Sequence, residues 1–195
     1  MEVKRKMTVD TEMFELGDII SFKLTTGEKV QARAVKETPD GMMFVTVDCL
    51  EDEQPMFKNT DDMENEDFSY DNSDLRKALN GAILATFPAE IRDRMKVVYG
   101  DSDLLRIPSE KEIFGTNEYG QEEGKVKQFK GMKNRRNRIT WQGSKTGVFE
   151  WYWLMNRHKK YASLFALFAL VGFEGFADYG GASVSLGVRP VFLLS

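Results

Sequence analysis

The chain has 195 residues, a hydrophobic fraction of 42% that includes 14 Phe, 3 Trp and 6 Tyr, and a formal net charge of −4 at neutral pH. This amount of apolar and aromatic material excludes a disordered chain, and the length is typical of one domain whose core needs no disulfide or metal. The single cysteine excludes a disulfide framework within the chain, and the negative charge argues against wholesale binding to nucleic acid.

Residues 1–13 begin with a basic cluster and lack the apolar stretch of a signal peptide, so this segment is a candidate disordered N-terminus. The most apolar stretch, 161–173, is too short to cross a bilayer as a helix. The sequence predicts no signal peptide, no membrane association, and a location in the cytoplasm or in a virion.

Residues 14–50 predict a meander of three β-strands, because apolar residues alternate with polar ones around turns at Gly27 and Gly41. Cys49 closes this region without a partner. Acidic residues dominate 51–72, which predicts a solvated loop. The loop lacks the spacing of an EF-hand, so we expect no metal there.

Residues 73–115 predict short helices. Ser73 is a good N-cap, and Leu75, Leu79 and Ile83 recur every four residues behind it. A second short helix is expected after Pro88. A third is expected from Ser109, where the sequence matches a capping box and Gly115 stands at the C-terminal position.

Residues 125–145 carry lysines and arginines without a carboxylate. Two interpretations are open for this basic loop: a contact with nucleic acid or another polyanion, and a solvated loop that balances the acidic segment. Residues 146–195 return to strands and glycine turns, which predicts a C-terminal sheet.

The order of motifs resembles a domain family of unknown function from bacteria and their phages that has a C-type-lectin-like fold. This family is distantly similar to formylglycine-generating enzymes and to the variable proteins of diversity-generating retroelements. The resemblance covers the chain from about Gly17 to the end. It rests on the helical Ser-x-Leu-Arg-x-x-Leu-Asn at 73–80, the Trp-x-Trp-Leu at 151–154 and the terminal Gly-Val-Arg-Pro at 187–190.

The resemblance implies one α+β domain over 1–195, with antiparallel twisted sheets and two to three short helices. It gives structural roles to Trp151, Trp153, Arg189 and Pro190. Arg189 lies between apolar runs, so we expect it to be buried with carboxylate or carbonyl partners, and Pro190 suits a strand start or an edge. The two tryptophans are open to core packing or to a role as a stacking platform.

The resemblance also implies a ligand surface between the tryptophan strand and the last strand. We expect part of that segment to be exposed and to bind an unknown protein or glycan. The candidate ligand-binding residues are Asn156, Arg157, His158, Tyr161, Phe173, Glu174, Phe176, Asp178 and Tyr179.

Catalysis is not expected. Activity of the formylglycine-generating type depends on cysteines, and this chain has one, far upstream. His158 stands alone in a polar cluster, which predicts a solvated loop histidine without a metal, and no nucleophile with a base is evident. We therefore expect a non-enzymatic ligand-binding or protein-interaction module without a cofactor. The alternatives are a structural or accessory component of a phage or mobile element, and a polyanion contact through 125–145.

Overall fold

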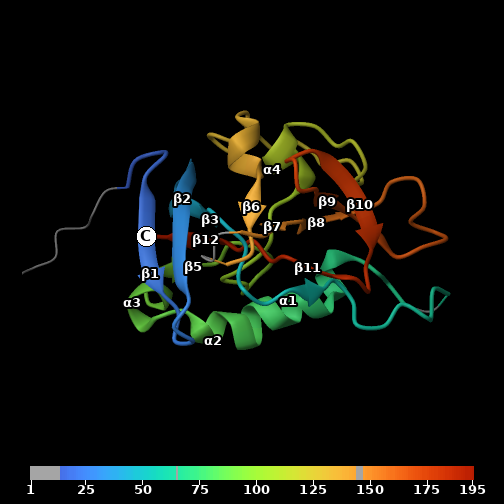
Figure 1. Cartoon of the computed structure of the whole chain (residues 1–195), viewed down its shortest axis with the longest axis horizontal. Coiled ribbons are helices and arrows are strands. Elements are labelled where there is room, and N and C mark those ends of the chain that lie inside the picture. Colours follow the sequence, from blue (N-terminus) through green and yellow to red (C-terminus); the bar gives the residue numbers. More distant parts are fainter. Residues whose placement is uncertain (1–13, 65, 144–146) are drawn as a thin grey trace, which may run out of the picture.

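The computed structural model describes residues 14–64, 66–143 and 147–195, and within these ranges the strands form four sheets accompanied by short helices (Figure 1). The largest sheet has the order β1-β2-β3-β12-β5, and all its neighbouring strands are antiparallel. Its strands are β1 (Ile19–Lys23), β2 (Lys29–Thr38), β3 (Gly41–Thr46), β12 (Val191–Leu194) and β5 (Met95–Lys96). The predicted meander is confirmed, whereas the expectation for 1–13 lies outside the described residues.

A second sheet has the order β10-β9-β8 and is also antiparallel. Two further pairs, β4 with β11 and β6 with β7, complete the strands of the described residues. The bounds are β8 (Tyr152–Arg157), β9 (Leu167–Val171), β10 (Ala177–Gly181), β4 (Gln54–Pro55), β11 (Ser185–Leu186), β6 (Thr140–Trp141) and β7 (Phe149–Glu150).

A helical segment runs along the lower side of the sheets in Figure 1 and consists of α1 (Asp74–Ala78), a π-helical turn η2 (Leu79–Ile83) and α2 (Leu84–Thr86). The predicted N-cap is confirmed, because the Arg76 backbone N–H donates to the Ser73 hydroxyl at 3.0 Å. Leu75 and Leu79 are buried on the predicted face.

The other helical elements are η1 (Tyr70–Asn72), α3 (Ala89–Arg92), α4 (Glu110–Phe114) and η3 (Arg135–Arg138). In α4 the predicted capping box is present, and Gly115 ends the helix at φ 80° in the left-handed region. The Glu112 carboxylate of this box also accepts two bonds of 2.6 Å from the buried Arg106. The ion pair thereby joins α4 to the strand-like segment before it.

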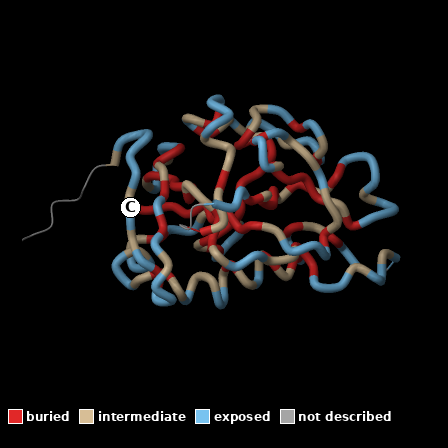
Figure 2. Tube along the Cα trace, viewed as in Figure 1, coloured by how far each residue is buried: buried red, intermediate tan, exposed pale blue. Residues whose placement is uncertain are grey.

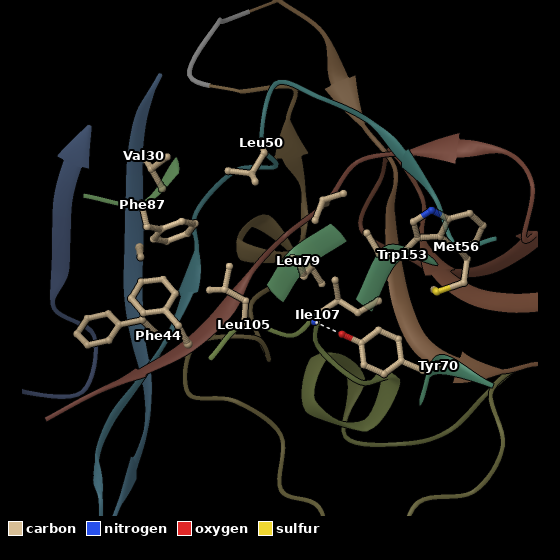
Figure 3. Close-up of a cluster of buried hydrophobic side chains, with 14 of the residues drawn as sticks. Val30, Phe44, Leu50, Met56, Tyr70, Leu79, Phe87, Leu105, Ile107 and Trp153 are labelled. Carbon is tan, nitrogen blue, oxygen red and sulfur yellow. Dashed lines mark hydrogen bonds between the residues drawn. The ribbon is translucent and has the colours of Figure 1, made fainter. Parts of the chain in front are cut away.

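Two apolar clusters lie on opposite faces of the central strands. Phe192 and Leu194 of β12 belong to the first cluster, and Val191 and Leu193 belong to the second. The same alternation occurs in β8, because Trp153 packs in the first cluster and Tyr152 and Leu154 in the second. Figure 2 shows these strands as buried, and Figure 3 shows the first cluster around Phe44, Leu79 and Trp153. Burial on both faces explains why the terminal strand is apolar without alternation.

The sequence predicts one C-terminal sheet over 146–195, but the strands of this region belong to several sheets. Of its strands, β12 inserts between β3 and β5, while β8, β9 and β10 form their own sheet. Strands β7 and β11 pair with partners from earlier in the chain. The tail therefore packs directly against the opening meander.

The acidic and basic segments are both better anchored than simple loops. Within 51–72, Met56, Phe57 and Phe68 are buried, whereas most of the acidic residues between and around them are exposed. Within 125–143, Phe129 and Met132 are buried in the second cluster. Apolar side chains at intervals along each charged segment fix it to the core, which the charge pattern alone conceals.

Candidate functional site

The predicted ligand-binding residues fall into two groups, one at each end of the β9–β10 hairpin. His158 at the end of β8 and Tyr179 in β10 lie at one end, with ring centroids 4.6 Å apart. Phe173, Glu174 and Phe176 lie at the other end, in the connection between β9 and β10. Tyr179 pairs with Ala169 in the middle of β9, so about half of that strand, at about 3.3 Å per residue, lies between Tyr179 and the connection. The sequence predicts one ligand surface from this segment, whereas the structure places its residues on two surfaces.

Four rings pack together at the first end, which we call the tyrosine cluster: Tyr119, His158, Tyr161 and Tyr179. The Tyr119 and Tyr179 centroids are 5.1 Å apart, and the His158 and Tyr161 rings stack at 5.0 Å. Tyr161 and Tyr179 remain about two-fifths exposed, at 42% and 40%. The cluster is therefore a fixed aromatic surface whose outer rings contact solvent.

His158 is buried, so the prediction of a solvated loop histidine is wrong. Its Nδ1 accepts backbone N–H groups of Lys160 at 3.1 Å and Tyr161 at 3.4 Å. Burial, and then the neighbouring Lys160 charge, lower the pKa of His158, so the ring is neutral at neutral pH. Its role in this geometry is to hold the turn and support the tyrosines.

Asn156 is also buried, against the expectation of exposure. Its Oδ1 accepts the Glu110 backbone N–H at 2.7 Å, and its Nδ2 donates to the Gln121 carbonyl at 3.3 Å. The buried Glu110 carboxylate in turn accepts backbone N–H groups of Tyr119 and Gly120 at 2.9 and 2.8 Å. These bonds position the loop that carries Tyr119.

Arg157 is half-buried, and its guanidinium donates to the Ala162 carbonyl. Burial lowers the pKa of Arg157, with Asp67 acting weakly in the opposite direction. Asp178 is half-buried as well, and its Oδ1 accepts the Tyr179 backbone N–H at 2.8 Å. Both side chains are thus engaged with nearby backbone, Arg157 at the tyrosine end and Asp178 in β10 opposite Leu170.

At the other end lies a groove of about 770 Å³, which we call the phenylalanine groove. Phe173 forms an edge contact of 4.9 Å with Trp151, and the Arg135 guanidinium lies 4.9 Å from the Phe176 ring centroid. The groove combines apolar walls with one positive and one negative side chain. Its lining residues are Arg135, Ile139, Gly147, Val148, Phe149, Phe173 and Glu174.

The basic segment holds the hairpin in place. Arg135 donates to the Glu174 carbonyl at 3.2 Å, and Arg138 donates to the Gly175 carbonyl at 3.0 Å. Gly175 has φ 74°, and a Cβ there would meet the Arg135 carbonyl oxygen at 3.0 Å. A charged segment that appears solvated in the sequence therefore fixes the turn that presents Phe173 and Phe176.

The predicted structural residues meet beneath this surface. Arg189 is buried, and its guanidinium donates to the Thr46 carbonyl, the Tyr152 hydroxyl and the Asn137 carbonyl at 2.7, 2.9 and 3.1 Å. The prediction of a buried arginine with carbonyl acceptors is confirmed. We call this set of contacts the Arg189 junction.

Gly187, Pro190 and the tryptophans complete the scaffold. A Cβ at Gly187 would lie 2.4 Å from the Glu150 Cγ, so only glycine fits there. Pro190 directly precedes β12, as predicted for a strand start, although β12 is a central strand and not an edge. Trp153 is buried and donates to the Gln54 carbonyl at 2.8 Å, and Trp151 is half-buried in the same cluster. Both tryptophans therefore pack in the core.

The described cations of residues 130–138 lack carboxylate partners. Over the described ranges, no ion pair is found for Lys130, Lys133, Arg135, Arg136 or Arg138. Burial lowers the pKa of Arg138, and the nearby Arg135 charge lowers it further. The Lys130 backbone N–H donates to the Val35 carbonyl, which places this segment beside β2, where Arg33 and Lys36 add positive charge.

The cysteine of the chain, Cys49, is buried. Burial raises the pKa of the Cys49 thiol to about 12, which makes it a poor nucleophile. In the described part of the chain, no group of three or more His, Cys, Asp or Glu side chains is arranged to hold a metal ion. Among those same residues, no helix has the length and apolarity needed to span a membrane.

Sequence reasoning missed Tyr119, Arg135, Val148 and Phe149 as members of these surfaces. Tyr119 follows α4 in a loop without a recognisable motif. Its backbone N–H donates to Glu110, and its carbonyl accepts the Lys159 N–H at 2.8 Å, which brings it to the hairpin. Phe149 lies in a two-residue strand and stacks on Trp141 at 4.2 Å. The sequence offers one local indication of this contact: Trp141 and Phe149 lie on either side of the glycines Gly143 and Gly147, which are typical of a turn.

Comparison of the chain with protein-family models, with curated proteins and with solved structures gives no match.

Proposed function

We propose that this chain is a non-enzymatic recognition module with a C-type-lectin-like arrangement, which binds a protein or glycan ligand through the two ends of the β9–β10 hairpin. The observation that carries the proposal is the set of large apolar side chains exposed around this one hairpin. Phe173 and Phe176 are exposed by 49% and 54%, and Leu164 and Phe165 project at the tyrosine end with 63% and 57%. Apolar groups gathered in this way are typical of interaction sites.

The rigid support beneath these side chains favours recognition over nonspecific stickiness. The Arg135 and Arg138 bonds fix the hairpin turn, and His158 fixes the turn that carries Tyr161. A preformed surface loses little conformational entropy on binding.

A combined glycan and peptide array tests the proposal. The wild-type protein is expected to select a small set of probes, and the double variant Phe173→Ser, Phe176→Ser is expected to lose them. Val97→Ser is the matched control, because Val97 is similarly exposed at 45% but lies beside β5 and away from the hairpin. Selection of no probe by the wild type, or equal losses in both variants, would contradict the proposal.

A second candidate is a polyanion contact through the basic segment. It is favoured by the absence of ion pairs for the described cations of 130–138 and by their position beside Arg33 and Lys36. Titration with duplex DNA at about 50 mM and about 200 mM salt should then show binding that weakens strongly with salt, since phosphate contacts release counterions. Absence of binding at the lower salt concentration ends this candidate.

The remaining alternative, a structural or accessory component of a phage or mobile element, predicts self-association instead. Sedimentation of the wild type and of Phe173→Ser, Phe176→Ser distinguishes it. An oligomeric wild type and a monomeric double variant would favour assembly through the same groove.

A further inference from the structure

Strand β10 has a free edge. It is the outermost strand of its sheet and pairs only with β9 in the described residues. The Gly172 N–H donates to the Phe176 carbonyl, and the Ala182 N–H donates to the Ala166 carbonyl. Because hydrogen-bonded pairs alternate along an antiparallel ladder, Asp178 and Gly180 face β9 with their backbone groups. The backbone groups of Ala177, Tyr179 and Gly181 therefore point away from the sheet.

The other edges of the two main sheets differ from this one. The outer edge of β8 is covered, since the Met155 N–H donates to the Pro108 carbonyl and the Arg157 carbonyl accepts the Gln121 N–H. Strand β1 carries Lys23, a residue type that protects edges from pairing. Strand β10 carries neither lysine nor proline, and Gly180 and Gly181 leave its backbone open to close approach.

The surroundings of this edge specify the chemistry of an occupant. At this edge the Asp178 carboxylate accepts the outward Tyr179 N–H at 2.8 Å, which places a negative charge beside the tyrosine cluster. The Glu118 charge, followed by burial and the Asp178 charge, also raises the pKa of the adjacent Tyr119. Of the two lysines at this end, Lys159 is engaged with the Asn117 carbonyl at 2.9 Å, and the Lys160 charge acts on His158. Tyrosine faces beside carboxylates attract a guanidinium or ammonium group. At the other end, Phe173 and Phe176 offer apolar contact.

We propose that the free edge of β10 binds an extended, basic peptide segment as a fourth strand, with a lysine or arginine against the tyrosine cluster. The inference rests on the proposed recognition function and narrows its ligand to a peptide. The Tyr179 N–H exchanges the Asp178 carboxylate for a peptide carbonyl, and the released carboxylate pairs with the basic side chain. The N–H and carbonyl of Ala177 and the N–H of Gly181 supply the neighbouring backbone bonds, while the Gly181 carbonyl accepts the Val184 N–H at 3.1 Å.

Two synthetic peptides of alternating threonine and valine test the inference, one with a central arginine and one with a central glutamate. Binding is measured by fluorescence anisotropy against the full chain. The arginine peptide is expected to bind at least about tenfold more tightly than the glutamate peptide, because like charges at the site are unfavourable. Asp178→Asn should reduce this preference without abolishing binding.

Proline at outward positions tests the strand pairing itself. Ala177→Pro removes an outward N–H and leaves the β9 ladder intact, so it is expected to abolish binding of the arginine peptide. Ser21→Pro is the matched control, because Ser21 occupies an outward position of the β1 edge and should leave peptide binding unchanged. If Ala177→Pro fails to fold, Gly181→Pro replaces it.

Several outcomes would overturn the inference: absence of binding by both peptides, equal binding of the two, or full binding by a folded Ala177→Pro. The array experiment distinguishes failure of strand addition to β10 from failure of the proposed recognition function. Array hits that depend on Phe173 and Phe176 but survive Ala177→Pro would retain the recognition function and reject strand addition. Glycan hits alone would do the same.

Discussion

The Arg189 junction and the β9–β10 hairpin come from neighbouring parts of the chain, yet they use polar groups in opposite ways. At the junction, a buried guanidinium meets three acceptors from three separate segments. At the hairpin, arginines secure only the turn backbone, and the large apolar side chains remain exposed. The difference separates residues that fix the fold from residues that the fold leaves available for binding.

Replacing Arg189 should have the largest effect on this comparison. Arg189→Leu leaves the Thr46 carbonyl, the Tyr152 hydroxyl and the Asn137 carbonyl without their donor, at a cost of roughly 3 kcal/mol or more in the free energy of unfolding. Urea denaturation followed by tryptophan fluorescence measures the loss. Arg33→Leu is the control, since Arg33 is half-buried on β2 and should change stability by about 0.5 kcal/mol at most. Equal effects of the two substitutions would contradict the role of the junction.

A pH-dependent effect of intermediate size is expected at Glu150, which lies behind Gly187 in the scaffold. Burial, followed by a hydrogen bond with Glu53, raises the pKa of Glu150 from 4.5 to about 7. The folded state therefore binds this proton more tightly than the unfolded state. The associated stability is fully present below pH 4.5 and is lost as the pH rises through about 7.

Glu150→Gln should remove most of this dependence and make the protein relatively more stable at pH values above 7. Thermal unfolding from pH 5 to pH 8 measures the slope. Burial also raises the pKa of Asp48 above its ordinary value of 3.8, so this carboxyl adds a slope of the same sign as the pH rises above that value. Glu174→Gln, at an exposed carboxylate of the hairpin, serves as the control. If stability depends on pH as steeply in Glu150→Gln as in the wild type, Glu150 is not the group responsible.

The same contrast explains which parts of the structure were predictable from the sequence. The Ser73 cap, the capping box at Ser109 and the Gly115 helix end depend on residues within one turn of each other, and all three are confirmed. The burial of Arg189 was also predictable, because apolar runs flank it and a buried charge requires acceptors. The α+β class with mostly antiparallel sheets follows from the same local patterns.

The errors concern residues whose environment comes from distant segments. His158 lies among lysines in the sequence, but Tyr119 and Tyr179 cover it in the fold. Asn156 is buried because it caps the backbone of α4. The pairing of β12 with both β3 and β5 likewise depends on contacts across most of the chain. Local periodicity cannot specify such contacts, since it records only which face of an element is apolar.

Substitutions of exposed hairpin residues should have the smallest effect on stability. They allow a direct comparison of buried and exposed residues within one hairpin. Phe168 and Phe176 belong to the same two-stranded unit, yet Phe168 is fully buried and Phe176 is 54% exposed. Phe176→Ser gives up its contact with Arg135 and should lower the free energy of unfolding by no more than about 1 kcal/mol. Phe168→Ser also leaves a cavity in the core and should cost about 3 kcal/mol or more. Differential scanning calorimetry of both variants compares them directly, and similar losses would mean that the hairpin surface belongs to the folded core and not to a binding site.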